Sequence, residues 1–205
     1  FTVKAENRAG LVTQPVISSG ILVDIYAPGT PGTPVDTIPA GQNASYWNDA
    51  YTSTTTLVWD WSASTGVASG ILSYYVCVST ISGGADIYSD TPTINTSCTY
   101  NNAQPGYTYY AKVRSRSNSG SYSGYSDNSS GIKVDVTSPD MPQITYLGDE
   151  NKWINKDSQA QMVLQIQAND PESGLIEYQY AVGSQPGASD ISGGTWYSVT
   201  TASIS

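Results

Sequence analysis

Residues 69–79 read SGILSYYVCVS, and this stretch returns about a hundred residues later as SGLIEYQYAVG at 173–183. Apolar side chains fill every second position: Tyr74, Val76 and Val78 in the first stretch, and Tyr178, Tyr180 and Val182 in the second. A period of two over several residues is typical of a strand with one buried face. The two stretches therefore predict the same half-buried strand in two copies of one domain.

Further matches extend this repeat in both directions. LVWDW (57–61) matches LQIQA (164–168), and Leu57, Trp59 and Trp61 are predicted to share a buried face. VKAENRAG at the start of the chain matches VRSRSNSG, and GILVD after Ser19 matches GIKVD after Ser130. The repeat is about 110 residues long, which is close to the length of one β-sandwich.

The sequence predicts an all-β chain of tandem Ig-like β-sandwiches, one complete and two partial. Residues 1–30 are expected to form the last two strands of one sandwich. Residues 31–139 are expected to form a complete sandwich, and residues 140–205 the first strands of a third. The Pro-rich joints YAPGTPGTP (26–34) and VTSPDMP (136–142) are expected to be stiff.

The middle segment resembles a fibronectin type III domain. The stretch TSCTYNNAQPGYTYYAKVRSRSNSG (96–120) carries the residues of the resemblance, namely Pro105, Gly106, Tyr109, Val113 and Ser115. The flanking repeats look like those of long tandem surface proteins of bacteria. The resemblance implies a structural or adhesive module and implies no catalytic residues. The fold by itself does not specify a reaction, because it carries many functions.

Composition narrows the class of protein. The 205 residues are 39% hydrophobic and only 12% charged, with a net charge of −9, which argues against a nucleic-acid or anionic-membrane partner. No apolar run of about 20 residues is present, so no membrane insertion is expected. Without an initiator Met or a signal peptide, the chain is interpreted as a piece of a mature secreted product, extracellular or on the cell surface.

Catalytic and metal sites have weak support. The chain has no His, and Asp60, Asp86 and Asp90 lie on different predicted elements, so no enzyme activity and no cofactor are expected. Asp170 and Glu172 in NDPESG (169–174) are weak Ca²⁺ candidates. The joint acids Asp24, Asp135 and Asp140 could add oxygens to that pair. An ordinary polar turn explains the same residues and is favoured.

Cys77 and Cys98 form a candidate disulfide, since an even count in a secreted chain suggests pairing. Strand alternation argues the other way, because it points Cys77 outward and Cys98 inward, and Cβ atoms directed apart cannot be bridged. Three sequons provide glycosylation candidates at Asn43, Asn95 and Asn128.

Aromatic residues offer one surface candidate. Tyr46, Trp47 and Tyr51 are the best candidates for an exposed aromatic patch that could stack on a glycan. Two classes of function are weighed. One is a structural segment of an extracellular filament, stalk or surface fibre, and the other is an adhesin or carbohydrate-binding module. Repetition of whole domains and stiff joints favour the first.

The two ends of the chain complement each other in this interpretation. Residues 1–24 supply the strands that residues 140–205 lack. Two explanations remain open: the chain is a window cut from a longer tandem chain, with the cut inside a domain, or separate copies associate head to tail. The expected partners are therefore other copies or adjacent repeats of the same protein. The predicted interface residues are Phe1, Val3, Ala5, Ile21 and Val23 at the head, and Leu164, Ile166, Tyr178 and Tyr180 at the tail.

Overall fold

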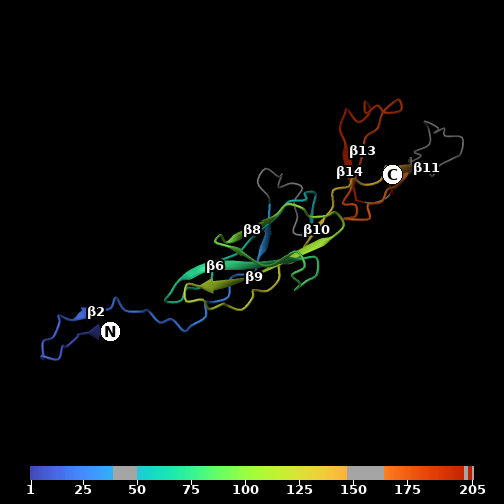
Figure 1. Cartoon of the computed structure of the whole chain (residues 1–205). Coiled ribbons are helices and arrows are strands. Elements are labelled where there is room, and N and C mark those ends of the chain that lie inside the picture. The colour runs from blue at the N-terminus through green and yellow to red at the C-terminus, as the bar shows by residue number, and fades with distance from the viewer. Residues whose placement is uncertain (39–49, 147–163, 201–202, 205) are drawn as a thin grey trace. The chain divides into compact units, whose positions relative to one another are not determined.

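The computed structural model describes residues 1–38, 50–146, 164–200 and 203–204, and Figure 1 shows the strands along the chain. Within these residues every regular element is a β-strand, and no helix exists that could cross a membrane. The predicted all-β class is therefore confirmed. The strands are β1 (Thr2–Val3), β2 (Val16–Ile17), β3 (Val35–Thr37), β4 (Tyr51–Thr52), β5 (Leu57–Asp60), β6 (Ile71–Ser79), β7 (Tyr88–Thr93), β8 (Ser97–Tyr100), β9 (Thr108–Ser117), β10 (Ile132–Val134), β11 (Gln143–Tyr146), β12 (Leu164–Gln167), β13 (Tyr178–Tyr180), β14 (Tyr197–Val199) and β15 (Ser203–Ile204).

The chain forms two compact units. The first comprises Phe1–Gln42, Thr56–Asn101 and Thr108–Ile132, and the second comprises Asn43–Thr55, Asn102–Tyr107 and Lys133–Ser205. In the first unit β5 lies between β3 and β8, and β6 lies between β9 and β7, all in antiparallel pairs. The long pair β6 and β9 runs side by side through the unit (Figure 1).

The core of the first unit is the one that strand alternation predicts. Trp59 is fully buried, and Leu57 and Trp61 are 1% and 6% exposed. The rings of Trp61 and Tyr74 meet edge to face, with 5.9 Å between their centroids. From β6 and β9, the buried side chains are Tyr74, Val76, Val78, Tyr109, Ala111 and Val113.

A returning segment, residues 121–131, covers the edge of β9 that faces away from β6. The N–H groups of Ser123, Ser126 and Ser129 donate to the carbonyls of Ser115, Val113 and Ala111, at 2.8–2.9 Å. The hydroxyls of the same three serines accept from the N–H groups of those residues, at 2.9–3.0 Å. These serines are buried, and each one satisfies both polar groups of a β9 residue.

The returning segment also changes the environment of Cys77. Alternation predicts an outward side chain, but Cys77 is only 3% exposed. The hydroxyl of Tyr125, from the returning segment, lies 3.8 Å from the Cys77 sulfur and covers it. The prediction that Cys77 points to solvent was therefore wrong, because the face opposite the core carries a further layer of side chains.

The described strands of the second unit pair as follows. β4 pairs with β10 in parallel, with Tyr51 opposite Lys133. β11, β12 and β15 form a three-stranded antiparallel sheet, and β13 pairs with β14 alone. Ile166 of β12 is 5% exposed and is the most buried apolar side chain of β11 to β14.

Gly131 offers a test of the returning segment. Its φ is +89°, and a Cβ there would lie closer to the Tyr110 ring than van der Waals contact allows. Gly131→Ala should lower the free energy of unfolding by about 1–3 kcal/mol. Gly20→Ala, at φ +83° with open space around it, is the matched control and should cost less in urea unfolding. Equal losses for the two variants would contradict the close packing against Tyr110.

Candidate functional site

The head segment, residues 1–24, adopts the conformation of residues 111–131. The N–H of Thr13 donates to the Ala5 carbonyl at 2.9 Å, as Ser123 does to Ser115. The N–H of Ser18 donates to the Phe1 carbonyl at 2.8 Å, as Ser129 does to Ala111. The hydroxyls of Thr13 and Ser18 also accept from these residues, as the serines do.

The turns of the two segments correspond as well. Gly10 has φ +81° where Gly120 has +95°. An isolated bridge joins Glu6 to Val12, and its counterpart joins Arg116 to Tyr122. Val3 therefore corresponds to Val113, and β1 with β2 reproduces β9 with its returning segment.

The exposure of the apolar side chains differs between the head segment and its repeat counterpart. In the head, the apolar side chains Phe1, Val3, Ile21 and Val23 are 95%, 65%, 86% and 76% exposed. Their counterparts Ala111, Val113, Ile132 and Val134 are at most 1% exposed. The head thus presents to solvent the side chains that its repeat counterpart buries in a core.

β13 reproduces β6 in the same way. Gly174 has φ +77° and Gly70 has +75° before the respective strands. After them, Ser184 donates from its N–H and hydroxyl to Asp190 at 2.9 and 2.7 Å. Thr80 donates to Asp86 from the same two groups, at 3.2 and 3.0 Å. Tyr178, Tyr180 and Val182 thus correspond to Tyr74, Val76 and Val78.

The tail strands leave an open apolar groove. Tyr178 and Tyr180 are half-buried, whereas their counterparts Tyr74 and Val76 are buried. A groove of about 610 Å³ runs between β12 and β13. Its apolar lining includes Ile144, Ile166, Leu175, Tyr178, Tyr180 and Trp196. Of the predicted tail residues, Ile166, Tyr178 and Tyr180 line this groove, and Leu164 lies on β12 opposite Tyr146.

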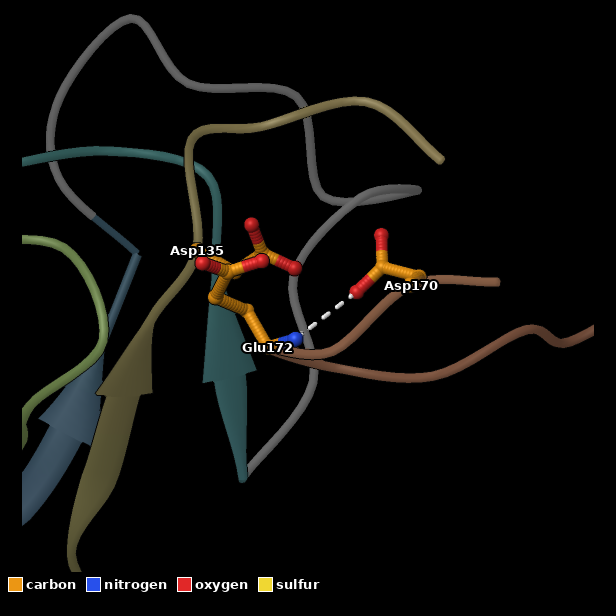
Figure 2. Close-up of side chains that lie close together, drawn as sticks. All are labelled: Asp135, Asp170 and Glu172. Carbon is orange, nitrogen blue, oxygen red and sulfur yellow. Dashed lines mark hydrogen bonds between the residues drawn. The ribbon is translucent and has the colours of Figure 1, made fainter. Parts of the chain in front are cut away.

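Three carboxylates converge next to β10 in the second unit. Asp135 follows β10 directly, and Asp170 and Glu172 lie in the NDPESG loop. Each offers one oxygen, and these oxygens lie within 4.8 Å of one another (Figure 2). A cavity of about 540 Å³ adjoins them and is also lined by Tyr51.

Hydrogen bonds already engage these carboxylates. Asp170 accepts from the N–H groups of Glu172, Ser173 and Gly174, at 3.1, 2.9 and 3.2 Å. The Thr137 hydroxyl lies 2.9 Å from Asp135 and 3.0 Å from Glu172. Ca²⁺ takes six to eight oxygens, and these three residues offer part of such a set. The hydrogen bonds that Asp170 accepts are those of a polar turn.

An aspartate precedes each of the two Pro-rich joints at corresponding positions of the repeat, Asp24 before the first and Asp135 before the second. The N–H of Ser69 donates to Asp24 at 2.8 Å, and the N–H of Tyr26 donates to it at 3.1 Å. At the second joint the N–H of Thr137 donates to Asp135 at 3.0 Å. The loop before β6, which bonds to Asp24, has Gly66 and Ala68 at the positions where the loop before β13 has Asp170 and Glu172. The extra carboxylates are therefore particular to the second joint.

The environment of Asp135 makes the second joint sensitive to acid. Burial acts to raise the pKa of Asp135, but hydrogen bonds from the Ser173 side chain and from Thr137 hold it below the ordinary 3.8. A lowered folded-state pKa gives stability that is present above about pH 4 and is lost as the pH falls through the folded-state pKa.

Asp135→Asn should therefore reduce the loss of stability on acidification between about pH 4 and pH 2. The measurement is the urea midpoint against pH for the wild type and the variant. Thr137→Val, which removes one donor to Asp135, should change the slope in the same direction and by less. An Asp135→Asn protein with the pH slope of the wild type would contradict this role.

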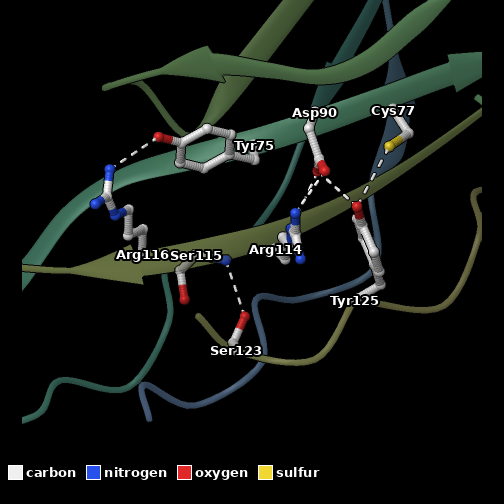
Figure 3. Close-up of polar contacts among 8 residues, drawn as sticks. All are labelled: Tyr75, Cys77, Asp90, Arg114, Ser115, Arg116, Ser123 and Tyr125. Atoms are coloured by element: carbon white, nitrogen blue, oxygen red, sulfur yellow. Dashed lines mark hydrogen bonds and ion pairs between the residues drawn. The ribbon is translucent and has the colours of Figure 1, made fainter. Parts of the chain in front are cut away.

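A second polar cluster covers β9 in the first unit. Arg114 donates to Asp90 from Nε at 3.0 Å and forms an ion pair with it at 2.5 Å, while Tyr125 donates to the same carboxylate (Figure 3). The Arg114 guanidinium also stacks on Tyr122 and Tyr125, at 4.4 and 4.8 Å from the ring centroids. These contacts fasten the returning segment to β9.

The sequence did not predict this cluster, although β9 carries Lys112, Arg114 and Arg116 at alternate positions of a chain with only 8 Lys and Arg residues. That spacing was the available signal. The head segment has Lys4 in place of Arg114 and Val12 in place of Tyr122, so it does not repeat this cluster.

Both cysteines are free thiols. Cys77 lies on β6 and Cys98 on β8, which belong to different sheets. Burial raises the pKa of Cys98 to about 11, so this thiol stays protonated at neutral pH. The candidate disulfide is not present in the structure, because the two strands present these side chains in different layers.

The remaining surface candidates are only partly described. Tyr46, Trp47 and Asn43 lie outside the described residues. Tyr51 is half-buried on β4. Of the other sequon residues, Asn95 is exposed between β7 and β8, and Asn128 is half-buried in the returning segment.

No family model matches the chain, and no curated protein matches it. Among solved structures, the chain is similar to one titled "Crystal structure of chicken CNTN1 FN1-FN3 domains", at 13% identity and a TM-score of 0.37. The match covers 99% of this chain and 65% of that chain. The chain therefore spans less than two thirds of the length of that structure.

Proposed function

We propose that the chain is a structural segment of an extracellular filament, stalk or surface fibre built of tandem β-sandwiches. Its head and tail segments complete each other between successive copies. The observation that carries this proposal is the exposure of Phe1, Val3, Ile21 and Val23, whose repeat counterparts are buried. A segment that exposes core residues is stabilised when a partner covers them.

The composition and the resemblance support the extracellular part of the proposal. The resemblance to fibronectin type III domains implies a structural or adhesive module. The low share of charged residues, 12%, is consistent with this interpretation. The Pro-rich joint supports a stalk, since Pro28, Pro31 and Pro34 are buried and the N–H groups of Gly29 and Gly32 bond to Thr65 and Ser62. No catalytic role is proposed.

Sedimentation of the purified full chain tests the proposal. Successive copies that complete each other form a heterologous contact, which propagates into a filament unless it closes into a ring. The expected result is a concentration-dependent series of oligomers, with filaments or rings in negative-stain micrographs. A compact monomer at all concentrations up to about 100 µM, a range in which weak specific complexes associate, would overturn the proposal.

A glycan-binding module is the second candidate. The cavity beside Asp135 and Asp170 is also lined by Tyr51. Carboxylates accept hydrogen bonds from hydroxyl groups, and an aromatic ring offers an apolar face to a sugar ring. Retardation of the chain in a polysaccharide gel, lost on Tyr51→Ala, would support this candidate. Unchanged mobility across charged and neutral polysaccharides would exclude those glycans as partners.

A further inference from the structure

We propose that β1 of one copy adds to the free edge of β13 in a second copy, antiparallel, with Val3 opposite Tyr180. The inference rests on the proposed function and specifies its contact. It names the two strand edges, the register between them and the face that each side chain takes.

The middle domain supplies the template. In it β6 pairs with β9, with Tyr74 opposite Ser115, Val76 opposite Val113 and Val78 opposite Ala111. The tail counterparts of the β6 residues are Tyr178, Tyr180 and Val182, and the head counterparts of the β9 residues are Ala5, Val3 and Phe1. The same register therefore pairs Tyr178 with Ala5, Tyr180 with Val3 and Val182 with Phe1.

The two edges that this pairing needs are open in the described residues. β6 has β7 on one side and β9 on the other, whereas β13 has only β14, the counterpart of β7. β9 has its returning segment on the side opposite β6, and β1 has the corresponding β2. The remaining edge of β13 and the remaining edge of β1 are therefore the two that meet in the middle domain. Unpaired edges of this kind readily accept a further strand.

The inner faces also complement each other in size. Trp59 in the middle domain corresponds to the smaller Ile166 in the tail, where the groove of about 610 Å³ lies. Ala111 corresponds to the larger Phe1 in the head. In the composite core, the head therefore contributes a larger side chain than its counterpart and β12 a smaller one, so the two differences in volume offset each other.

The side chains on the outer faces of β1 and β13 limit the affinity between the two copies. The register places Lys4 opposite Gln179 and Thr2 opposite Ala181, on the face opposite that of Val3 and Tyr180. It also places Glu6 opposite Glu177, since their counterparts Arg116 and Ser73 are paired in the middle domain. Like charges directly opposite each other are unfavourable, so this pair weakens the contact.

The charge pair provides a test of the register. Glu6→Lys and Glu177→Lys should each tighten association about two- to five-fold, which is the range for one cross-strand pair. The double variant should return to the wild-type affinity, because it restores a like-charge pair. Additive tightening in the double variant would contradict the pairing of these two residues.

Engineered cysteines test the pairing directly. The full chain with Lys4→Cys and Gln179→Cys is assembled and then exposed to oxidised glutathione. Since paired residues bring Cα atoms within disulfide range, a ladder of linked multimers is expected on a non-reducing gel. Each single variant controls for the native thiols and should give no ladder.

The shifted pair Glu6→Cys with Gln179→Cys is the matched control, because it lies two residues out of register. Its yield of multimers should be at least about ten-fold lower, as Cα atoms more than about 7 Å apart are not bridged. If the chain sediments as a polymer but the shifted pair links as well as the matched pair, the register is wrong and the proposed function stands. If the matched pair links within one chain, giving a monomer, the second copy is not the partner. If no variant assembles, the register and the proposed function both fail.

Discussion

Trp61→Ala should lower the free energy of unfolding of the first unit by about 3–5 kcal/mol, the range for truncating a buried large aromatic side chain. Trp61 is 6% exposed and its ring packs edge to face on Tyr74. Removing the indole leaves a cavity beside Tyr74 and exposes that ring, so a transfer and a cavity contribution add. The measurement is urea unfolding followed by the fluorescence of the remaining Trp residues.

Trp196→Ala is the matched control for this prediction. Trp196 is 64% exposed, so the same truncation should change the stability of the isolated chain by less than about 0.5 kcal/mol. A loss under about 1 kcal/mol for Trp61→Ala would show that Trp61 does not belong to the core.

Val3→Asp should weaken self-association at least about 100-fold, because the composite sandwich would bury a carboxylate without a partner. The monomer should remain as stable as the wild type, since Val3 is 65% exposed in the single chain. Sedimentation at several concentrations measures the first effect, and thermal unfolding of dilute protein measures the second.

Thr2→Asp controls for the added charge. Thr2 is adjacent to Val3 on β1 but takes the opposite face, so its carboxylate should remain in water. Association of Thr2→Asp should stay within about five-fold of the wild type. Equal weakening by the two variants would indicate that net charge, and not burial of the inner face, governs association.

Strand alternation was sufficient to predict the core and the class of fold. Leu57, Trp59 and Trp61 alternate in the sequence and are buried in the structure, as are Tyr74, Val76 and Val78. Alternation reports two faces of one sheet, and one of them must be apolar when it meets a second sheet. The internal repeat then gave the correspondence between head, middle and tail.

Alternation failed where a third layer of side chains covers the sheet. Cys77 is buried because Tyr125 lies over it. Hydrogen bonds made by Ser123, Ser126 and Ser129 hold the segment that carries Tyr125 against β9. Their spacing of three residues is visible in the sequence but follows neither a strand nor a helix period. The bonds of Asp24 and Asp135 at the two joints likewise depend on turns that bring distant residues together.

A density map of the assembled filament at side-chain resolution tests the composite sandwich most directly. We expect residues 1–7 of one copy to lie along β13 of the next, with Val3 beside Tyr180 and Phe1 inside the groove lined by Ile166. A map in which Val3 and Val23 contact no residue between 164 and 200 of an adjacent copy would contradict the composite sandwich and, with it, the head-to-tail polymer.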